Sequence, residues 1–276
     1  MKAGKLRGAY KACDERNRQV VKLITSLKSE HPYWGYRRIW ANLNHFYRVN
    51  ISLNTVYALM SKHGLLSKKY SKNKALRIIK SKPQADRPNQ YWGIDMTKVL
   101  TPTGWVYITV VLDWFSKKVV GYHIGLQSKA CDWLSALDMA LNRQFPDGAR
   151  GKGLSLVSDN GCQPTSVSFM KSCGILGIKQ IFTSFCNPKG NAETERFMRT
   201  LKEECAWLVE WKNALELTQA LEKWFEKYNQ SYLHSKLGYI TPANAELIGN
   251  NSKQVSQFCR LTNLGQYNRK TDLGVG

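Results

Sequence analysis

Apolar residues recur at the i, i+3, i+4, i+7 spacing of a helix face in three segments near the start of the chain, residues 20–27, 36–43 and 56–63. Ser52 is suited to cap the start of the third helix, and Gly64 is suited to follow its end. Three short helices, the last two separated by a brief connection, are typical of a helix-turn-helix. The spacing alone is also compatible with a helical bundle that only packs or binds protein.

From residue 90 onward the pattern changes to β-branched and aromatic runs. Segments 91–100, 105–116 and 117–127 predict three strands in antiparallel succession. The remaining predicted elements are, in order, a helix over 129–145, a short strand and tight turn over 154–161, a helix over 167–177, a strand over 179–184 and a helix over 191–211. This order is typical of an α/β fold, a mixed sheet with helices on both faces. The three leading antiparallel strands favour a ribonuclease H-like fold.

Positive charge is concentrated at the front of the chain. The formal net charge is +21, and residues 1–82 hold 19 Lys and Arg against three acidic residues, whereas the other 194 residues hold 22 against 17. Such a basic module favours a polyanionic partner, and nucleic acid is the first candidate. An anionic membrane surface is the alternative, but it would require a basic amphipathic helix with a broad apolar face. The globular pattern of the front module therefore favours nucleic acid.

The front module offers several side chains for such a partner. Asn54, Tyr57 and Lys62 would lie on the outer face of the third helix, where Asn54 and Tyr57 could reach base edges. Arg37 and Arg38, early in the second helix, are suited to contact phosphates. We therefore predict DNA binding by this module.

A strongly basic stretch separates the two patterns. Residues 68–82 hold seven basic residues and no acid, and Pro83 and Pro88 follow. The stretch is either a solvated linker or an arm that lies along a DNA backbone. The predicted organisation is a helix-turn-helix domain over 1–67, a basic linker over 68–88, an α/β core with a C-terminal helical extension over 89–250 and a tail over 251–276.

The compartment is predicted from what the sequence lacks. There is no apolar run of about 18 residues and no signal-peptide pattern. The seven cysteines are scattered and contain no C-x-x-C pair, which favours reduced, mostly buried thiols over disulfides or a zinc site. We therefore expect a cytoplasmic protein without a membrane partner.

Three acidic residues are placed as a catalytic site would need them. Asp95 lies inside the first predicted strand, where an acid is unfavourable unless it is paired, hydrogen-bonded or bound to metal. Asp159 lies at the end of the fourth strand, where α/β sheets place ligands, and Glu195 follows on the last helix with 35 residues between the two. These elements can bring the three carboxylates to one sheet edge. Taken singly, each could instead be a buried ion-pair partner, a turn former or a surface residue.

Two glutamates compete for the third position. Glu193 and Glu195 are two residues apart, so on a helix their side chains point about 160° apart. Glu195 shares a flank with Arg199 and Lys202, whereas Glu193 lies on the other flank in the first turn, where an acid favours the helix dipole. We assign Glu195 to the site and Glu193 to the capping region. The stripe that would pack on the sheet comprises Thr194, Phe197, Met198 and Leu201.

Two other polar residues are expected to serve the structure. Asp113, in the turn after the second strand, is predicted to cap that turn. His234 is predicted to be structural or to face DNA rather than to act in catalysis. Since no Ser–His–Asp or Cys–His arrangement suggests itself, a covalent protein–DNA intermediate is not expected.

Several segments resemble the OrfB-type insertion-sequence transposases of the IS-three family. WGIDMT, SDNGCQP and NAETERFMRTLKEE resemble that family's D-x-T, S-D-x-G-x-Q and D-N-A-x-x-E-x-F-x-x-x-L-K-x-E boxes. HPYWGYRRIWANLN with ISLNTVYALMSKHGL resembles its helix-turn-helix signature, and LDWFSKKVVGY and YNQSYLHSKLGYITP resemble two further boxes. The likeness spans about residues 30–245. It departs from the family's pattern at Ala58, Pro164, Gly190, Tyr232 and Leu233.

The resemblance implies a retroviral-integrase-like catalytic core. Asp95, Asp159 and Glu195 match the Asp-Asp-35-Glu triad, and none of the departures touches them. The implied activity is that of a DDE transposase, which cleaves the ends of a mobile DNA element and joins the 3′-OH to DNA. Arg199 and Lys202 are candidates to bind the DNA and to stabilise charge on the phosphate.

Three carboxylates are hard oxygen ligands suited to Mg²⁺ or Mn²⁺. We expect two such ions, with Asp95 bridging both and with Asp159 and Glu195 each holding one. The family also implies a homo-oligomer on DNA and an OrfA-type partner or fusion. Two alternatives remain open: a ribonuclease H-like nuclease without strand transfer, and a non-enzymatic DNA binder derived from a transposase.

Overall fold

The computed structural model describes residues 2–66, 84–183 and 191–251, with side chains described from residue 15 onward. The chain divides into two units, residues 1–78 and 79–276, and each is described by itself. The predicted linker over 68–88 lies mostly outside the described residues, and so does the predicted tail over 251–276. None of the helices in the described ranges combines the length and the hydropathy that a membrane span requires.

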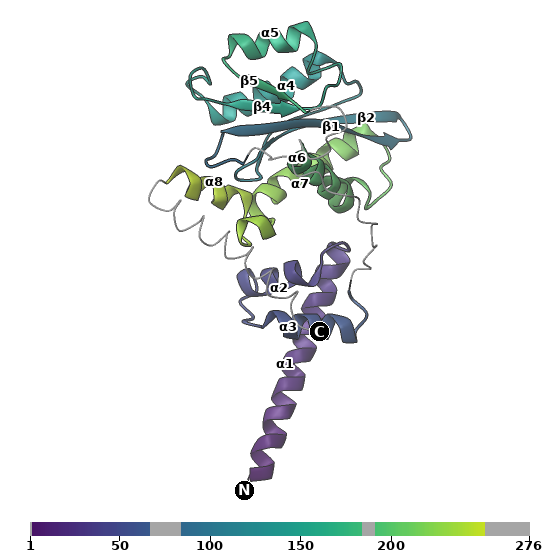
Figure 1. Ribbon diagram of the computed structural model, residues 1–276. Coiled ribbons are helices and arrows are strands. Elements are labelled where there is room, and N and C mark those ends of the chain that lie inside the picture. The colour runs from purple at the N-terminus through teal and green to yellow at the C-terminus, as the bar shows by residue number, and fades with distance from the viewer. Residues whose placement is uncertain (1, 67–83, 184–190, 252–276) are drawn as a thin grey trace, which may run out of the picture. The chain divides into compact units, whose positions relative to one another are not determined.

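Three helices form the first unit, as the spacing of apolar residues predicts. They are α1 (Lys2–Glu30), α2 (Tyr36–His45) and α3 (Leu53–Lys62) (Figure 1). The Ser52 hydroxyl caps the start of α3 by accepting a hydrogen bond from a backbone N–H of the first turn at 3.1 Å. Gly64, after the end of the helix, has a φ of 67°. The three apolar stripes meet in one cluster of buried side chains: Val20, Ile24, Leu27, Trp34, Ile39, Leu43, Val56 and Met60.

A five-stranded mixed sheet organises the second unit. The strands are β1 (Tyr91–Thr101), β2 (Gly104–Asp113), β3 (Val119–Gly125), β4 (Ser155–Ser158) and β5 (Lys179–Phe182). Their order across the sheet is β3-β2-β1-β4-β5. The first three strands pair antiparallel, and β4 and β5 continue the sheet in parallel with β1. β1 therefore lies at the centre, where the antiparallel and parallel parts of the sheet meet.

Helices cover both faces of this sheet, as Figure 1 shows. The helical elements are α4 (Ala130–Gln144), α5 (Val167–Ile175), α6 (Ala192–Leu201), the π-helical turn η1 (Lys202–Ala206), α7 (Ala214–Ser231), the 3-10 turn η2 (Ser235–Leu237) and α8 (Pro242–Asn250). α4 and α5 pack on one face around Trp92 and Ile94 of β1. α6 and α7 pack on the other face around Val106, Ile108 and Val110 of β2.

The helix predicted over 191–211 is shorter than expected. α6 ends at Leu201, and η1 follows with a hydrogen bond from Trp207 N to Lys202 O at 2.9 Å, which spans five residues. Such π-helical turns insert one residue into a helix and are frequent at functional sites. The prediction was wrong beyond residue 206, where the chain leaves the helix at an end that the spacing of apolar residues does not mark.

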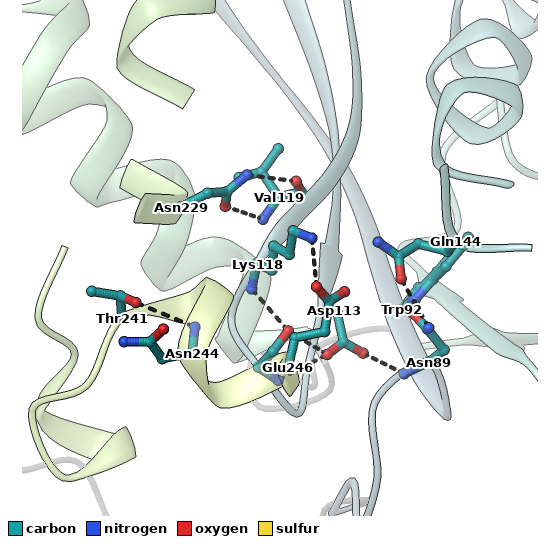
Figure 2. Close-up of polar contacts among 11 residues, drawn as sticks. Asn89, Trp92, Asp113, Lys118, Val119, Gln144, Asn229, Thr241, Asn244 and Glu246 are labelled. Atoms are coloured by element: carbon teal, nitrogen blue, oxygen red, sulfur yellow. Dashed lines mark hydrogen bonds and ion pairs between the residues drawn. The ribbon is translucent and has the colours of Figure 1, made fainter. Parts of the chain in front are cut away.

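Asp113 holds the turn between β2 and β3. Its buried carboxylate accepts hydrogen bonds from Ser116 N at 2.8 Å, Ser116 Oγ at 2.6 Å and Asn89 N at 3.0 Å. Figure 2 shows Asp113 beside Asn89, whose side-chain amide also accepts from Trp92 Nε1 and donates to Gln144 Oε1. The structural role predicted for Asp113 is therefore confirmed.

The C-terminal helices secure the start of the edge strand β3. The Asn229 side-chain amide of α7 accepts from Val119 N at 2.9 Å and donates to Val119 O at 3.0 Å. These two bonds satisfy backbone groups that an edge strand would otherwise expose. Lys118 Nζ also lies 2.5 Å from Glu246 Oε2 of α8, and both sets of contacts are drawn in Figure 2. The C-terminal helical extension is thus tied to the sheet.

Candidate active site

Asp95 lies near the middle of β1, the central strand. It pairs across the antiparallel ladder with Val110, whose side chain packs on the α6 and α7 face, so Asp95 points to that face. Burial raises the pKa of the Asp95 carboxyl to about 7; the Asp159 and Glu195 carboxylates raise it as well, whereas a hydrogen bond from Met96 N lowers it. Asp95 is thus a strand-interior acid that interacts electrostatically with both of the other predicted site residues.

Asp159 directly follows β4, as predicted. In the parallel ladder Tyr91 pairs with Ser155 and Gly93 with Val157, and continuing this register by two residues brings Asp159 level with Asp95. The Asp159 carboxylate accepts a hydrogen bond from the N–H two residues later at 3.0 Å, which is the geometry of an Asx turn. Asp159 therefore shapes its own turn as well as lying within electrostatic reach of Asp95.

Glu195 reaches the site because α6 lies very close to β1. Gly93 permits this approach: a Cβ atom there would lie 1.9 Å from Thr194 Oγ1 and 2.4 Å from Trp114 Nε1. Trp114 Nε1 donates to Thr194 Oγ1 at 3.2 Å, and Asn191 Nδ2 donates to a β1 carbonyl oxygen at 3.4 Å. These contacts fix the first turn of α6 on the strand that carries Asp95.

The predicted face of α6 is confirmed. Thr194, Phe197, Met198 and Leu201 are its buried residues, and Glu195 and Arg199 are exposed on the neighbouring flank. A cavity of about 310 Å³ lies between β1 and this flank. It is lined by Asp95, Met96, Thr97, Glu195, Met198, Arg199, Lys202 and Trp207.

The structure brings the three carboxylates together only in part. Asp95 and Glu195 line one cavity, whereas Asp159 does not line it. Across the part of the chain that the structure describes, no three His, Cys, Asp or Glu side chains are gathered tightly enough to hold a metal ion. The pKa of Asp95 is nevertheless raised by the charges of both Asp159 and Glu195. The arrangement is a loose cluster of carboxylates with Lys202 beside it.

Glu193 has a larger role than the one predicted for it. Its carboxylate lies 3.2 Å from Lys117 Nζ and 2.5 Å from Lys236 Nζ. The Lys117 and Glu193 side chains are only 12% and 11% exposed. Glu193 therefore ties α6 to the β2–β3 turn and to η2, and the prediction that it serves only the helix end was wrong. The sequence could not show that lysines from two distant segments converge on it.

The predicted DNA-contact residues of the first unit lie on α2 and α3. Asn54, Tyr57 and Lys62 are exposed on α3. Arg37 is exposed on α2, and Arg38 is half-buried with its guanidinium 5.6 Å from the ring of a buried tryptophan. These positions are within reach of a partner, and their contacts with DNA remain a prediction.

The other sequence predictions have mixed outcomes. His234 is the N-cap residue of η2, and its Nδ1 accepts a hydrogen bond from the N–H two residues later at 3.4 Å, so its position is structural.

The described cysteines are buried and exposed in equal number. Cys173 and Cys205 are buried, whereas Cys131 and Cys162 are exposed. The expectation of mostly buried thiols therefore fails for two of these four cysteines.

The sequence analysis missed one feature of the site in the second unit, and in the first unit one expected packing position was wrong. Gly93 was not singled out, although a glycine inside a strand is a recognised sign of close backbone approach. His63, the last position of the third apolar stripe, is exposed rather than packed. The first signal was present in the sequence, whereas the second depends on where α3 ends.

Comparison with known families matches both units. Residues 85–188 and 176–242 match two models described as integrase core domain, and residues 15–73 match a model described as HTH-like domain. The transposase for insertion sequence element IS629 of Shigella sonnei is 28% identical over 228 residues, which cover 78% of this chain and 74% of that protein. The transposase for element IS904 of Lactococcus lactis is 32% identical over 166 residues, 59% of this chain and 63% of that protein.

A solved structure shares the fold at low sequence identity. A chain of the simian T-cell lymphotropic virus intasome, solved with the PP2A regulatory subunit B56 gamma, aligns with a TM-score of 0.50 at 17% identity. The alignment covers 81% of this chain and 74% of that one. The predicted α/β, ribonuclease H-like core with a preceding helix-turn-helix-like domain is thereby confirmed.

Proposed function

Because the chain belongs to the insertion-sequence transposases that carry an integrase core domain, we propose that it cleaves the ends of a mobile DNA element and joins the 3′-OH to DNA. The observation that supports this most strongly is the cavity beside β1. There Asp95 and Glu195 lie with Arg199 and Lys202, so carboxylate ligands for a metal and cations that can bind a phosphate line the same cavity. Phosphoryl transfer depends mainly on such positioning and charge.

A divalent metal ion fits the chemistry of this cluster. The pKa of Asp95 is raised by burial and by two further carboxylates, and a bound cation would offset that repulsion. Asp95, Asp159 and Glu195 would hold Mg²⁺ or Mn²⁺ after drawing closer together around it. We expect two ions, with water and phosphate oxygens completing their coordination. When bound, the metal would activate the attacking oxygen and stabilise the leaving one.

The chain's own side chains would position the DNA. Arg199 and Lys202 line the same cavity as Glu195 and can neutralise phosphate oxygens near the carboxylates. The contact of Trp114 with Thr194, which Gly93 permits, holds α6 against β1 and so keeps Glu195 beside the cavity. Small displacements of such groups reduce rates strongly.

The first unit would supply affinity for DNA. Its basic charge favours phosphate binding, and the proposed contacts are Arg37 and Arg38 on α2 with Asn54, Tyr57 and Lys62 on α3. We also propose that the protein acts as a homo-oligomer on DNA and with an OrfA-type partner or fusion. Both of these proposals follow from the family.

The test is a joining assay with purified protein. Labelled duplexes from the DNA that flanks the gene are incubated with Mg²⁺ or Mn²⁺, and cleaved and joined strands are separated by gel electrophoresis. Asp95→Asn, Asp159→Asn and Glu195→Gln should each abolish both products and leave DNA binding intact. Asp138→Asn, which changes an exposed carboxylate of α4, serves as the matched control and should react as wild type does.

The outcomes separate the alternatives. Joined strands that disappear with the three site variants support the transposase. Cleavage without joining would favour a nuclease, or a reaction that requires the OrfA part, which adding that part would reveal. DNA binding without any reaction would favour a non-enzymatic binder. Glu193→Gln is not a neutral control, because it removes the ion pairs with Lys117 and Lys236, so its activity must be compared per folded molecule.

A further inference from the structure

A large aromatic side chain borders the candidate active site without packing into the core. Trp207 lines the cavity that contains Asp95 and Glu195, and it is 60% exposed. Its ring lies 5.6 Å from Lys202 Nζ, and among the described residues it stacks on no other aromatic ring. Exposing this much apolar surface is unfavourable, so packing does not account for the position of Trp207.

The π-helical turn η1 places Trp207 there. The bond from Trp207 N to Lys202 O lengthens the last turn by one residue, so the ring is brought back towards the side of the helix that carries Lys202. The next tryptophan behaves differently: Trp211 is partly buried against the α6–α7 core, and its Nε1 donates to Ala206 O at 2.9 Å. The same segment therefore uses one tryptophan for packing and leaves the other at the cavity.

We propose that Trp207 stacks on an unpaired nucleobase of the DNA next to the phosphate that reacts at Asp95 and Glu195. Every base has a flat π face, and an exposed aromatic ring beside cations is the common platform for single-stranded nucleic acid. Arg199 and Lys202 line the same cavity and would hold the backbone while the ring holds the base. This inference rests on the proposed function, since it names a substrate contact of the same site.

The neighbouring residues fit the same role. Leu208 and Val209, which follow Trp207 directly, are also exposed. Apolar side chains that enter a duplex separate stacked base steps and favour the unpaired state. A short apolar tip at residues 207–209 can thus open the DNA end while Trp207 accepts the released base. Unpairing at this point would give the carboxylates access to a phosphate that a closed duplex constrains.

Binding of a forked duplex tests the inference without requiring catalysis. The probe is a flanking-DNA oligonucleotide with 2-aminopurine in the unpaired arm, and the same duplex fully paired is the comparison. Stacking on Trp207 should quench the 2-aminopurine fluorescence of the forked probe. Trp207→Ala should abolish this quenching and weaken forked-probe binding roughly tenfold, whereas Trp207→Phe should keep most of both. Binding of the paired duplex should change little in either variant.

Trp105 provides the matched control. It is also an exposed tryptophan of the second unit, with Lys98 Nζ 4.4 Å from its ring, but it lies on β2 and does not line the cavity. Trp105→Ala should retain quenching and affinity. Equal behaviour of Trp207→Ala and wild type on the forked probe would overturn the inference, and so would an equal loss in Trp105→Ala.

Activity then separates this inference from the proposed function. If wild type cleaves, Trp207→Ala should cleave the paired duplex roughly tenfold more slowly, and a mismatch beside the cleavage site should restore much of the rate. Wild-type cleavage with an unimpaired Trp207→Ala would refute the stacking role alone. Wild type that quenches the forked probe through Trp207 but never cleaves would retain the stacking contact and refute the proposed reaction.

Discussion

Replacing Glu193 by glutamine is expected to destabilise the second unit through a single buried charge. Glu193 is shared by Lys117 at 3.2 Å and Lys236 at 2.5 Å, and these contacts join α6 to the β2–β3 turn and to η2. Glutamine preserves the size of the side chain but removes its charge. Lys117, with a side chain only 12% exposed, would then lose its principal counter-ion, and Asp113 would be the remaining carboxylate that acts on it.

The size of the effect follows from the burial of the pair. Removing one partner of a buried ion pair costs about 3–5 kcal/mol, because the other charge remains desolvated. The Lys236 side chain is 37% exposed, so its charge stays partly hydrated, and the glutamine oxygen can still accept a hydrogen bond. We therefore expect the lower end, about 3 kcal/mol. For a unit of this size that corresponds to a decrease in Tm of about 6–12 °C.

The sign of the pH dependence provides a sharper test. Burial lowers the pKa of Lys117 from its usual 10.5, and the attraction of Glu193 is the largest effect that opposes this, while Lys236 lowers the pKa and Asp113 raises it. Glu193→Gln should lower the pKa of Lys117 further. The pH range in which the unfolded state binds more protons than the folded state is then wider for the variant than for wild type. The stability of the variant rises with pH across that range. The loss of unfolding free energy relative to wild type should be largest at pH values below the pKa that Lys117 has in the folded variant. It should shrink at pH values above that pKa.

The assay is denaturant unfolding of wild type and variant, followed by circular dichroism, at about pH 6 and about pH 9.5. Glu203→Gln is the control, because Glu203 pairs with Arg199 at 3.4 Å on the exposed flank of the same helical segment, and it should change stability by less than about 1 kcal/mol. A Glu193→Gln variant as stable as the control, or a deficit that does not shrink at the higher pH, would refute the reasoning.

Three further predictions concern other parts of the chain. Gly93→Ala should destabilise the second unit by at least about 2 kcal/mol in denaturant unfolding, because its Cβ would meet Thr194 Oγ1 at 1.9 Å; unchanged stability would show that α6 shifts freely. Arg37→Ala should weaken DNA binding at low salt and reduce the slope of log affinity against log salt by about 1 in a titration; an unchanged slope would exclude a phosphate contact. Peptide mapping after thiol alkylation should label the exposed Cys131 long before Cys173, since burial raises the pKa of the Cys173 thiol to about 12; equal rates would contradict the burial.

Local pattern was sufficient for most elements of the fold. The spacing of apolar residues predicted α2 and α3 with the cap at Ser52, and β-branched and aromatic runs predicted the first three strands. These features depend on contacts between residues near one another in the chain, where helix and strand periods leave a direct trace. The buried stripe of α6 was predicted in the same way, and with it the exposed flank that carries Glu195.

The tertiary structure decided how the site is assembled and held. The need for glycine at residue 93 depends on Thr194, which lies far later in the chain, and the role of Glu193 depends on Lys117 and Lys236. The π-helical turn after Leu201, which leaves Trp207 at the cavity, likewise left no trace in the spacing of apolar residues. Sequence periodicity records which face of an element is buried, whereas the partners on that face are set only when distant segments pack together.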